Sequence, residues 1–453
     1  MKVHFIAIGG SAMHNLALAL SKKGYNVTGS DDEIFEPSKS RLKKIGILPT
    51  KLGWFPEKIT NQLDGVILGM HAREDNPELL KAKELGLKIY SYPEFLYEQS
   101  KNKIRVVIGG SHGKTTITSM ILHVLQFHKI DTDYMVGAQL KGFDVMVRLS
   151  ESAKYIILEG DEYLTSPIDR RPKFHLYKPD IALISGIAWD HFNVFPTFEN
   201  YIDQFKIFAN IIPADGSLIY CSIDDEVRKI GENTNLKNKY PYSLPNYFIE
   251  NNKTFINYNN QKFELQIFGK HNLMNMEGAR LVCNRIGISD LHFYEAIKTF
   301  SGASKRLEKI AESAKTLIFK DFAHSPSKLK ATIEAVKEQY PTRKLIACIE
   351  LHTYSSLNSD FLNQYNNSME KADEAIVFFS KHALELKKLP NLTENDIFNN
   401  FGRDDILIFN DSEKIANYLK SKNMENTNLL LMSSGNFDGI NIDNFAQEII
   451  VNK

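Results

Sequence analysis

The sequence predicts an α/β protein with three domains. The chain has 453 residues, which is more than one hydrophobic core usually organises, so two or three domains are expected. Short apolar segments alternate with amphipathic segments of helical period, and this alternation is typical of parallel sheets with crossover helices. This alternation of strands and helices begins again at about residue 104 and at about residue 303. We therefore expect domains at residues 1–103, 104–302 and 303–453.

The first domain shows the alternation clearly. A polar stretch at residues 99–103 is interpreted as the linker that ends this domain. The expected strands cover residues 3–8, 26–29, 65–68 and 88–90, and the expected helices cover residues 12–23 and 76–85.

The second and third domains follow the same rule. An Asn- and Tyr-rich stretch around residues 246–267 interrupts the pattern and is expected to be β structure within the second domain. The expected strands cover residues 104–108, 155–158, 181–184 and 217–220 in the second domain, and 316–319, 344–349, 375–379 and 429–432 in the third, with a helix at residues 327–339.

The composition excludes several classes of function. Apolar residues make up 43% of the chain, charged residues 24%, and the formal net charge is +0. Because there is no basic excess, nucleic acid is not an expected partner. The three cysteines form no C-x-x-C pair and are expected to be buried, reduced thiols. No apolar run approaches the ~20 residues of a membrane span, so we expect a cytoplasmic protein without membrane insertion.

The strongest local signal is a glycine turn between a strand and a helix, at residues 106–116. Glycines let backbone N–H groups approach phosphates, the helix N-terminus adds positive potential, and a lysine reaches the β- and γ-oxygens. Residue 108 is Ile where the first glycine of a P-loop is expected, so the loop is a shorter variant. The pattern predicts an ATP site, with a chance glycine turn before a helix as the alternative. The residues of the predicted site are Gly110, Ser111, His112, Gly113, Lys114, Thr115 and Thr116.

Carboxylates follow the next apolar strand, at the edge of the sheet where α/β proteins bind ligands. We expect Glu159 to bind the Mg²⁺ of ATP together with the Thr115 hydroxyl, since Mg²⁺ prefers oxygen ligands. Asp161 and Glu162 are interpreted as helix-capping or solvated acids, with a place at the metal as the alternative. His191 follows the strand at residues 181–184 and either serves the metal or the γ-phosphate, or is structural.

A second glycine turn follows the first strand of the chain and opens a helix. Its residues are Gly9, Gly10, Ser11, Ala12 and Met13, and Asp31 stands about 20 residues further on, where an acid holds ribose hydroxyls in dinucleotide-binding folds. Ala7 and Ala12 occupy positions where the dinucleotide motif has glycines. The turn therefore predicts either a nucleotide site or a plain tight turn.

The candidate site residues later in the chain are weaker signals when each is taken alone. Asn272 and Asn275 lie three residues apart at the start of a helix and so share one face. Arg306 and Asp321 lie where the second and third domains meet. Each of these has a plain alternative, as a capping or surface group or as an interdomain ion pair.

Taken in order, these motifs resemble the Mur ligases, the ATP-dependent amide-forming enzymes of peptidoglycan assembly and recycling, over essentially the whole chain. The resemblance implies a Rossmann-like first domain that binds the UDP of the substrate, a central P-loop ATPase-like parallel sheet, and a Rossmann-like third domain that brings the amine. It also implies that the nucleotide site includes Asn272, Asn275, Arg306 and Asp321, and that His191 and Glu159 act in catalysis with Lys114. The first glycine turn then binds the UDP diphosphate.

The resemblance extends to a branch of the family that uses UDP-N-acetylmuramate as acceptor. The stretch from Asp161 to Phe195 is similar to members that add the tripeptide L-Ala-γ-D-Glu-meso-diaminopimelate, and the alternative is addition of L-alanine. The chain departs from its relatives at Ser325, which replaces a histidine, and at residues 349–356, which lack an arginine. Lys206 is interpreted as a solvated lysine, with a carbamylated lysine near the metal as the alternative.

The implied reaction transfers the γ-phosphoryl group of ATP to a carboxylate, and an amine then attacks the acyl phosphate. Two other classes of function stay open at this point. A nicotinamide-dependent oxidoreductase would use NAD at the first glycine turn, and a nucleotide-gated binding module would keep Lys114 without an acceptor substrate. Neither alternative explains all the motifs together.

Overall fold

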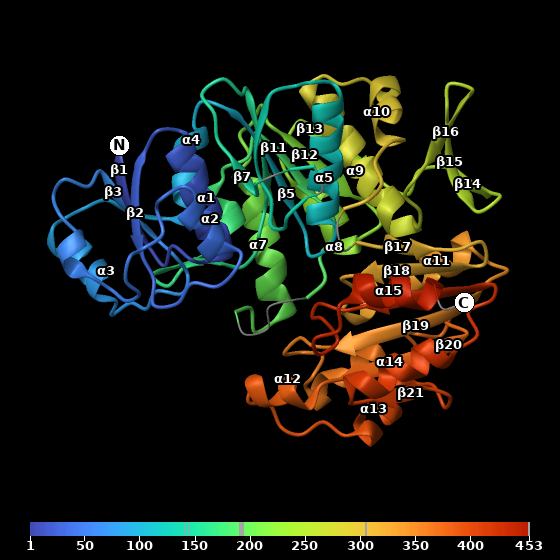
Figure 1. Ribbon diagram of the computed structural model, residues 1–453. Coiled ribbons are helices and arrows are strands. Elements are labelled where there is room, and N and C mark those ends of the chain that lie inside the picture. Colours follow the sequence, from blue (N-terminus) through green and yellow to red (C-terminus); the bar gives the residue numbers. More distant parts are fainter. Residues whose placement is uncertain (141, 144, 190–193, 304–305, 452–453) are drawn as a thin grey trace. The chain divides into compact units, whose positions relative to one another are not determined.

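The computed structural model describes residues 1–140, 142–143, 145–189, 194–303 and 306–451 (Figure 1). The chain forms two compact units. Unit 1 contains Met1–Leu244 and Met274–Ile297, and unit 2 contains Pro245–Leu273 and Lys298–Lys453. None of the described helices combines the length and the apolar character that a membrane span requires. The three cysteines are buried and unpaired, as predicted.

The N-terminal part of unit 1 is a parallel sheet with the strand order β2-β1-β3-β4. Two of its helices begin at side-chain caps: Asn76 accepts hydrogen bonds from two backbone N–H groups at the start of α3, and Ser91 and Glu94 form a capping box on α4. Because α4 continues to Ser100, the linker is shorter than predicted. The elements are β1 (Lys2–Ile6), α1 (Ser11–Lys22), β2 (Asn26–Ser30), α2 (Ser38–Lys44), η1 (Pro56–Lys58), β3 (Gly65–Leu68), α3 (Pro77–Glu84), β4 (Ile89–Ser91) and α4 (Tyr92–Ser100).

The central part of unit 1 is a sheet with the order β13-β12-β11-β5-β8-β6-β7, parallel except for β7. Its middle strands are buried along their length, which explains their continuous apolar runs. The strands are β5 (Ile104–Gly109), β6 (Thr132–Met135), β7 (Val147–Arg148), β8 (Tyr155–Glu159), β11 (Ile181–Ile184), β12 (Ser217–Cys221) and β13 (Asn238–Tyr242), with a separate hairpin of β9 (Leu164–Ser166) and β10 (Asp169–Pro172).

Helices connect these strands. The helix after the P-loop, α5, begins at Lys114, directly after the left-handed Gly113. The sequence reading missed β6, β7, β9, β10 and β13, which are short or carry polar residues. The helices are α5 (Lys114–Phe127), α6 (Lys173–Leu176), α7 (Phe198–Asn210), α8 (Asp225–Asn233), α9 (Lys270–Ile286), whose first turn belongs to unit 2, and α10 (Asp290–Ile297).

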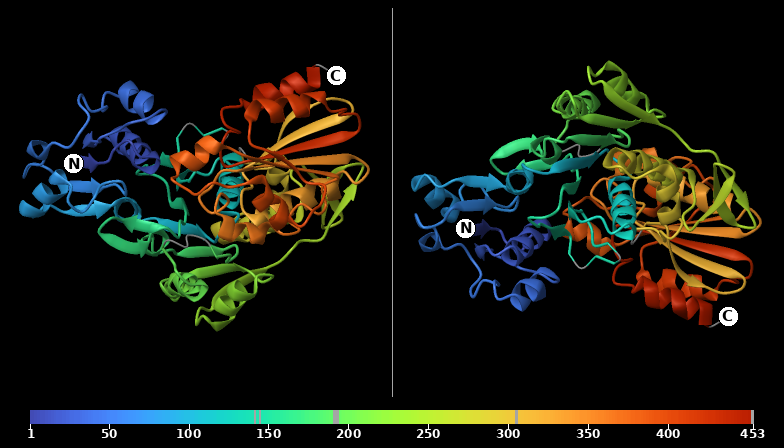
Figure 2. Two further views of the ribbon diagram at one scale, coloured as in Figure 1. Left: turned by 90° about the horizontal axis from the view of Figure 1, so that it is seen from below. Right: turned by 90° about the horizontal axis from the view of Figure 1, so that it is seen from above.

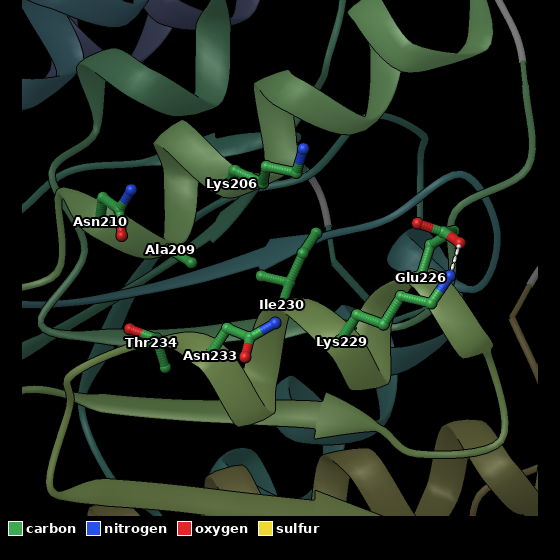
Figure 3. Close-up of a pocket in the computed structure, with 8 residues that line it drawn as sticks. All are labelled: Lys206, Ala209, Asn210, Glu226, Lys229, Ile230, Asn233 and Thr234. Carbon is green, nitrogen blue, oxygen red and sulfur yellow. Dashed lines mark hydrogen bonds and ion pairs between the residues drawn. The ribbon is translucent and has the colours of Figure 1, made fainter.

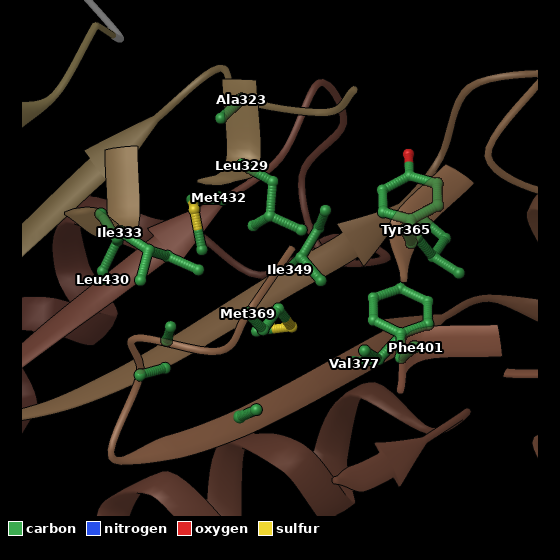
Figure 4. Close-up of a cluster of buried hydrophobic side chains, with 14 of the residues drawn as sticks. Ala323, Leu329, Ile333, Ile349, Tyr365, Met369, Val377, Phe401, Leu430 and Met432 are labelled. Atoms are coloured by element: carbon green, nitrogen blue, oxygen red, sulfur yellow. The ribbon is translucent and has the colours of Figure 1, made fainter. Parts of the chain in front are cut away.

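Unit 2 is built on a sheet with the order β17-β18-β22-β19-β20-β21, in which only β17 is antiparallel to its neighbour. Helices cover both faces: α11 and α13 pack on the core of one face (Figure 4), and α14 and α15 pack on the other (Figure 2). The elements are β17 (Glu308–Glu312), β18 (Thr316–Asp321), α11 (Pro326–Gln339), β19 (Lys344–Leu351), η2 (Ser359–Tyr365), β20 (Glu374–Phe379), α12 (Lys381–Leu386), α13 (Glu394–Phe401), β21 (Leu407–Phe409), α14 (Ser412–Ser421), β22 (Thr427–Met432) and α15 (Ile442–Val451).

The Asn- and Tyr-rich stretch forms an antiparallel sheet of β14 (Tyr247–Glu250), β15 (Lys253–Tyr258) and β16 (Gln261–Leu265), as predicted. It groups with unit 2, although the sequence placed it with the second domain. Side-chain hydrogen bonds to α11 attach it there: Tyr247 Oη donates to Glu338 at 2.7 Å and Thr254 Oγ1 donates to Gln339 at 2.8 Å.

Candidate active site

The P-loop turn depends on two glycines in left-handed conformations, Gly110 with φ +128° and Gly113 with φ +80°. A Cβ atom at Gly110 would overlap Ser185 Oγ, and one at Gly113 would overlap Asn275 Oδ1. Only glycine satisfies both the backbone angle and the close approach at these positions. The turn therefore presents bare backbone at the N-terminus of α5, as a phosphate site requires.

Neighbouring segments hold the rest of the loop in place. Ser111 N–H donates to the Gly186 carbonyl at 2.9 Å, and Ser111 Oγ accepts from Ala188 N–H at 2.9 Å and lies 2.9 Å from Tyr201 Oη. Ser185 Oγ donates to the His112 carbonyl. Thr116 is buried in the first turn of α5. Contacts with the segment after β11 and with α7 therefore hold the loop in place.

Lys114 lies between the loop and a buried acid. Its Nζ atom donates to the Gly110 carbonyl and to Glu162 Oε2, both at 2.7 Å. Burial opposes the charge of the ammonium, but Glu162, Asp161 and Glu159 outweigh it, so the pKa of Lys114 is raised. Tyr201 Oη donates to the other oxygen of Glu162 at 3.0 Å. The interpretation of Glu162 as a helix-capping or solvated acid is wrong, because its carboxylate is 2% exposed and paired with Lys114.

Glu159 and Thr115 meet at the edge of the sheet, as predicted. Thr115 Oγ1 donates to Glu159 Oε1 at 2.8 Å, and Gly137 N–H donates to Glu159 Oε2 at 2.9 Å. A side chain at Gly137 would lie 2.8 Å from this carboxylate. Two oxygen donors beside the P-loop fit a Mg²⁺ ion, which binds proteins through few groups and takes its other ligands from phosphate and water. His191, the third predicted metal ligand, lies outside the described residues.

Asp161 forms a second ion pair in this region. Lys173 Nζ lies 2.5 Å from Asp161 Oδ2, and Tyr163 N–H donates to Asp161 Oδ1 at 3.1 Å. Burial raises the pKa of Asp161, but Lys173 and Lys114 outweigh it, and the net shift is downward. Asp161 therefore carries a negative charge beside the P-loop. The sequence did not reveal its pairing with Lys173.

Asn275 and Asn272 have different surroundings although both lie at the start of α9. Asn275 packs against the P-loop glycine Gly113 in unit 1. Asn272 is buried and donates from Nδ2 to the Phe268 carbonyl at 3.0 Å in unit 2. The geometry within unit 1 therefore brings Asn275 to the P-loop.

Arg306 and Asp321 belong to unit 2. The Arg306 guanidinium lies over the ring of Phe322, 4.9 Å from its centroid. Asp321 is buried and accepts a 2.5 Å hydrogen bond from Thr332 Oγ1. Burial lowers the pKa of His271, and the nearby Asp321 opposes this shift. Their assignment to the nucleotide site stays a prediction.

The first glycine turn connects β1 to α1, and α1 begins at Ser11, followed by Ala12 and Met13. Asp31 closes the turn, because its Oδ2 atom accepts from Gly9 N–H at 2.6 Å. Burial is the main cause that raises the pKa of Asp31. Gly10 begins the helix as its N-cap residue. The structure thus places Asp31 beside the glycine turn, where both were predicted to bind a nucleotide. Asp31 also has a structural role, the hydrogen bond to Gly9, that the sequence did not indicate.

Lys206 lies on α7 with 57% of its side chain exposed, and its Nζ atom pairs with Asp203 at 2.7 Å. It faces a groove of about 370 Å³ between α7 and α8 (Figure 3). These contacts agree with the interpretation as a solvated lysine.

Sequence reasoning missed Ser185, Gly137 and Tyr201 as parts of the site. Ser185 follows β11 directly, and Gly137 follows β6 by two residues. The rule that ligands bind at the carboxyl ends of parallel strands identifies Ser185 once β11 is recognised. Tyr201 reaches Glu162 from α7 and has no such signal in the sequence.

A shortened P-loop with an acid on the adjacent strand defines the class of this protein as a P-loop enzyme that uses a nucleoside triphosphate. Three family models match the chain: the Mur ligase family catalytic domain at residues 2–103, the Mur ligase middle domain at residues 108–283, and the Mur ligase glutamate ligase domain at residues 305–435. The chain belongs to the Mur ligase family and is an ATP-dependent ligase that forms amide bonds. The oxidoreductase alternative is therefore wrong.

Curated relatives and solved structures agree with this assignment. The chain is 30% identical to the UDP-N-acetylmuramate–L-alanine ligases of Clostridium acetobutylicum, over 96% of the chain and 95% of that protein, and of Clostridium tetani, with the same coverage. It has the fold of a murein peptide ligase from Psychrobacter arcticus (22% identity, TM-score 0.62, 100% and 98% coverage). It also has the fold of the UDP-N-acetylmuramate–alanine ligase of Thermotoga maritima (20% identity, TM-score 0.70, 100% and 99% coverage).

Proposed function

We propose that this enzyme joins UDP-N-acetylmuramate to the tripeptide L-Ala-γ-D-Glu-meso-diaminopimelate in peptidoglycan recycling. The P-loop, in which Lys114 pairs with Glu162 and Thr115 contacts Glu159, supports the ATP-dependent step. The similarity of residues 161–195 to tripeptide-adding members supports the choice of amine. Asp161 and Lys173 of this stretch form an ion pair beside the P-loop. The proposal includes a cytoplasmic location, where ATP is available.

In the proposed reaction, the lactyl carboxylate of UDP-N-acetylmuramate attacks the γ-phosphorus of ATP, and the bond from this phosphorus to the β,γ-bridging oxygen breaks. ADP leaves, and the acyl phosphate remains. The amine then attacks the acyl carbon, loses a proton, and releases phosphate. Catalysis of this type consists mostly of positioning and charge neutralisation. Lys114 neutralises charge on the phosphoryl oxygens, and backbone N–H groups of residues 110–116 hold the phosphates.

Thr115 and Glu159, with His191 as the third ligand, would hold Mg²⁺, which neutralises phosphate charge when bound. The two oxygen donors lie 2.8 Å apart at one edge of the sheet, which supports this role. Gly9, Gly10 and Asp31 would bind the UDP moiety at the start of α1. Asn272, Asn275, Arg306 and Asp321 would complete the nucleotide site.

Addition of L-alanine is the second candidate function. The names of the curated relatives favour it, since the chain is 30% identical to two UDP-N-acetylmuramate–L-alanine ligases along nearly its whole length. The two functions share every step except the amine.

Phosphate release from ATP, measured with UDP-N-acetylmuramate and either amine, tests the proposal. Release with the tripeptide but not with L-alanine is expected. Release with L-alanine alone would establish the second candidate, and release with neither would refute both. Lys114→Ala is the control, and we expect it to abolish acceptor-dependent release. Because it leaves the buried Glu162 carboxylate unpaired, we also expect lower stability, and its circular dichroism spectrum at the assay temperature shows whether it is folded.

A further inference from the structure

The N-terminal and central parts of unit 1 meet where α1 packs against β7. β7 is the edge strand of the central sheet and pairs with β6. Gly137 follows β6 by two residues and donates its N–H to Glu159, the predicted ligand of Mg²⁺. On the other side of the contact, α1 begins in the first glycine turn. The contact between α1 and β7 therefore lies between the two predicted ligand sites of this unit.

Asn15 makes this contact from α1, and its side chain is fully buried. Its Oδ1 atom accepts from Met146 N–H at 3.2 Å, and its Nδ2 atom donates to the Ser11 carbonyl at 2.8 Å. Nδ2 also lies 3.4 Å from Met146 Sδ. A carboxamide suits this position because it offers an acceptor to Met146 and a donor to Ser11 at the same time. An apolar side chain would leave the buried Met146 N–H without this partner.

His14 fixes the orientation of the Asn15 amide. Its Nε2 atom lies 3.0 Å from Asn15 Nδ2, and its Nδ1 atom lies 3.0 Å from both the Gly10 carbonyl and Ser38 Oγ. Since an amide NH₂ group faces Nε2, this nitrogen is the acceptor and Nδ1 carries the proton of the neutral ring. Burial lowers the pKa of His14 and so favours the neutral ring. The first turn of α1 thus holds Asn15 in one orientation.

The linkage continues into the central sheet through Met146 and Val136. Val136 directly follows β6 and Met146 directly precedes β7. Val136 N–H donates to the Met146 carbonyl at 3.0 Å, which extends the antiparallel pairing of the two strands by one residue. The next residue is Gly137. The position of Met146 therefore determines where Gly137 lies.

Gly137 and Thr115 hold the Glu159 carboxylate from two sides. Gly137 N–H donates to Oε2 at 2.9 Å, and Thr115 Oγ1 donates to Oε1 at 2.8 Å. A Cβ atom at Gly137 would lie 2.8 Å from Oε1, so the backbone approaches the carboxylate closely. Groups that orient a metal ligand typically change metal affinity by about 10- to 100-fold. A displaced Gly137 would thus weaken a metal bound to Glu159.

We propose that Asn15 is a positioning residue for the metal site and acts on the Glu159 carboxylate through Met146. The metal site of the central sheet then depends on a side chain from the N-terminal part of unit 1. Asn15 itself touches neither the metal nor a substrate. This inference rests on the proposed function, because it takes Glu159 to bind the Mg²⁺ of ATP.

Titration calorimetry with a non-hydrolysable ATP analogue tests the proposal on the full-length enzyme. The affinity is measured in excess Mg²⁺ and in EDTA, and the ratio of the two values gives the contribution of the metal. Asn15→Leu keeps the approximate size of the side chain and removes its hydrogen bonds. We expect it to reduce the ratio by about 3- to 10-fold, while the affinity in EDTA stays unchanged.

Asn76→Leu is the matched control. Asn76 is a buried asparagine in the same part of unit 1, and it also accepts from backbone N–H groups, but at the start of α3. Both variants should melt at a lower temperature, since each leaves backbone N–H groups without a partner. Only Asn15→Leu should reduce the Mg²⁺ ratio. Asn15→Ala removes the same hydrogen bonds with a smaller side chain, and it gives the measurement if Asn15→Leu does not fold.

A double-variant cycle shows whether Asn15 acts through the metal ligand. Glu159→Gln should itself reduce the Mg²⁺ ratio. Added to Glu159→Gln, the Asn15→Leu substitution should reduce the ratio by a smaller factor than it does in the wild type, as expected for residues that act as a unit. Fully additive effects would show that Asn15 acts elsewhere and would overturn the proposal.

The calorimetric outcomes are separate from those of the turnover assay. A wild-type Mg²⁺ ratio in the Asn15 variants would overturn this inference, and so would an equal reduction in Asn76→Leu. An analogue affinity that falls equally in Mg²⁺ and in EDTA would also overturn it, because the effect would then concern the nucleotide and not the metal. Absence of phosphate release with either amine would refute the proposed function and leave the calorimetric result standing.

Discussion

Removal of the negative charge beside Lys114 should tighten nucleotide binding. In the structure, Lys114 Nζ pairs with Glu162 at 2.7 Å, and the two side chains are only 16% and 2% exposed. A phosphate that recruits Lys114 must compete with this carboxylate. Glu162→Gln keeps the shape and the hydrogen bond from Tyr201 but replaces a charged partner with a neutral one.

The size of the effect follows from the strength of the two hydrogen bonds. A buried hydrogen bond to a charged group contributes about 1.5–3 kcal/mol and a neutral one about 0.5–1.5 kcal/mol. The difference of about 1–1.5 kcal/mol corresponds to a 5- to 12-fold tighter complex. Folding stability should fall, because breaking a buried ion pair costs about 3–5 kcal/mol.

Titration calorimetry with a non-hydrolysable ATP analogue measures the affinity, and chemical denaturation measures the stability. Asp169→Asn is the control, because it removes a carboxylate that pairs with Arg171 on the hairpin of β9 and β10 instead of with Lys114. Unchanged or weaker binding in Glu162→Gln would refute the idea that this pair competes with phosphate.

Three other predictions concern the same molecule. Gly113→Ala should abolish ATP binding in calorimetry, since the new Cβ overlaps Asn275 Oδ1 at a φ of +80°, and normal affinity would contradict the described loop. Glu159→Gln should raise the Mg²⁺ concentration for half-maximal activity about 10-fold or more, and an unchanged Mg²⁺ profile would remove Glu159 from the metal site. Because the pKa of Glu350 is lowered by folding, its stabilising contribution is present above its unfolded pKa of about 4.3 and is lost as the pH falls through the folded value. The stability difference between wild type and Glu350→Gln should therefore shrink on acidification below pH 5, and a constant difference in denaturation curves would contradict this.

Much of the fold could be predicted because its signals are local. The strands at β3 and β11 were predicted residue for residue, since each is a short apolar run between polar segments. The short edge strand β7 and the polar β10 were missed, because neighbouring segments and not their own composition make them strands. The grouping of residues 245–273 with unit 2 depends on contacts to α11 that local pattern does not encode.

The candidate active site also combines features that local sequence predicts with features that depend on tertiary contacts. The sequence by itself determined the P-loop and the position of Glu159, because glycine spacing and strand ends are properties of neighbouring residues. Only the tertiary structure decided which charges meet. Glu162 pairs with Lys114 across 48 residues, and Glu350 meets Ser433 and Phe437 across more than 80. Such pairs form because parallel strands distant in sequence end at one edge of a sheet, where a buried charge must find a partner.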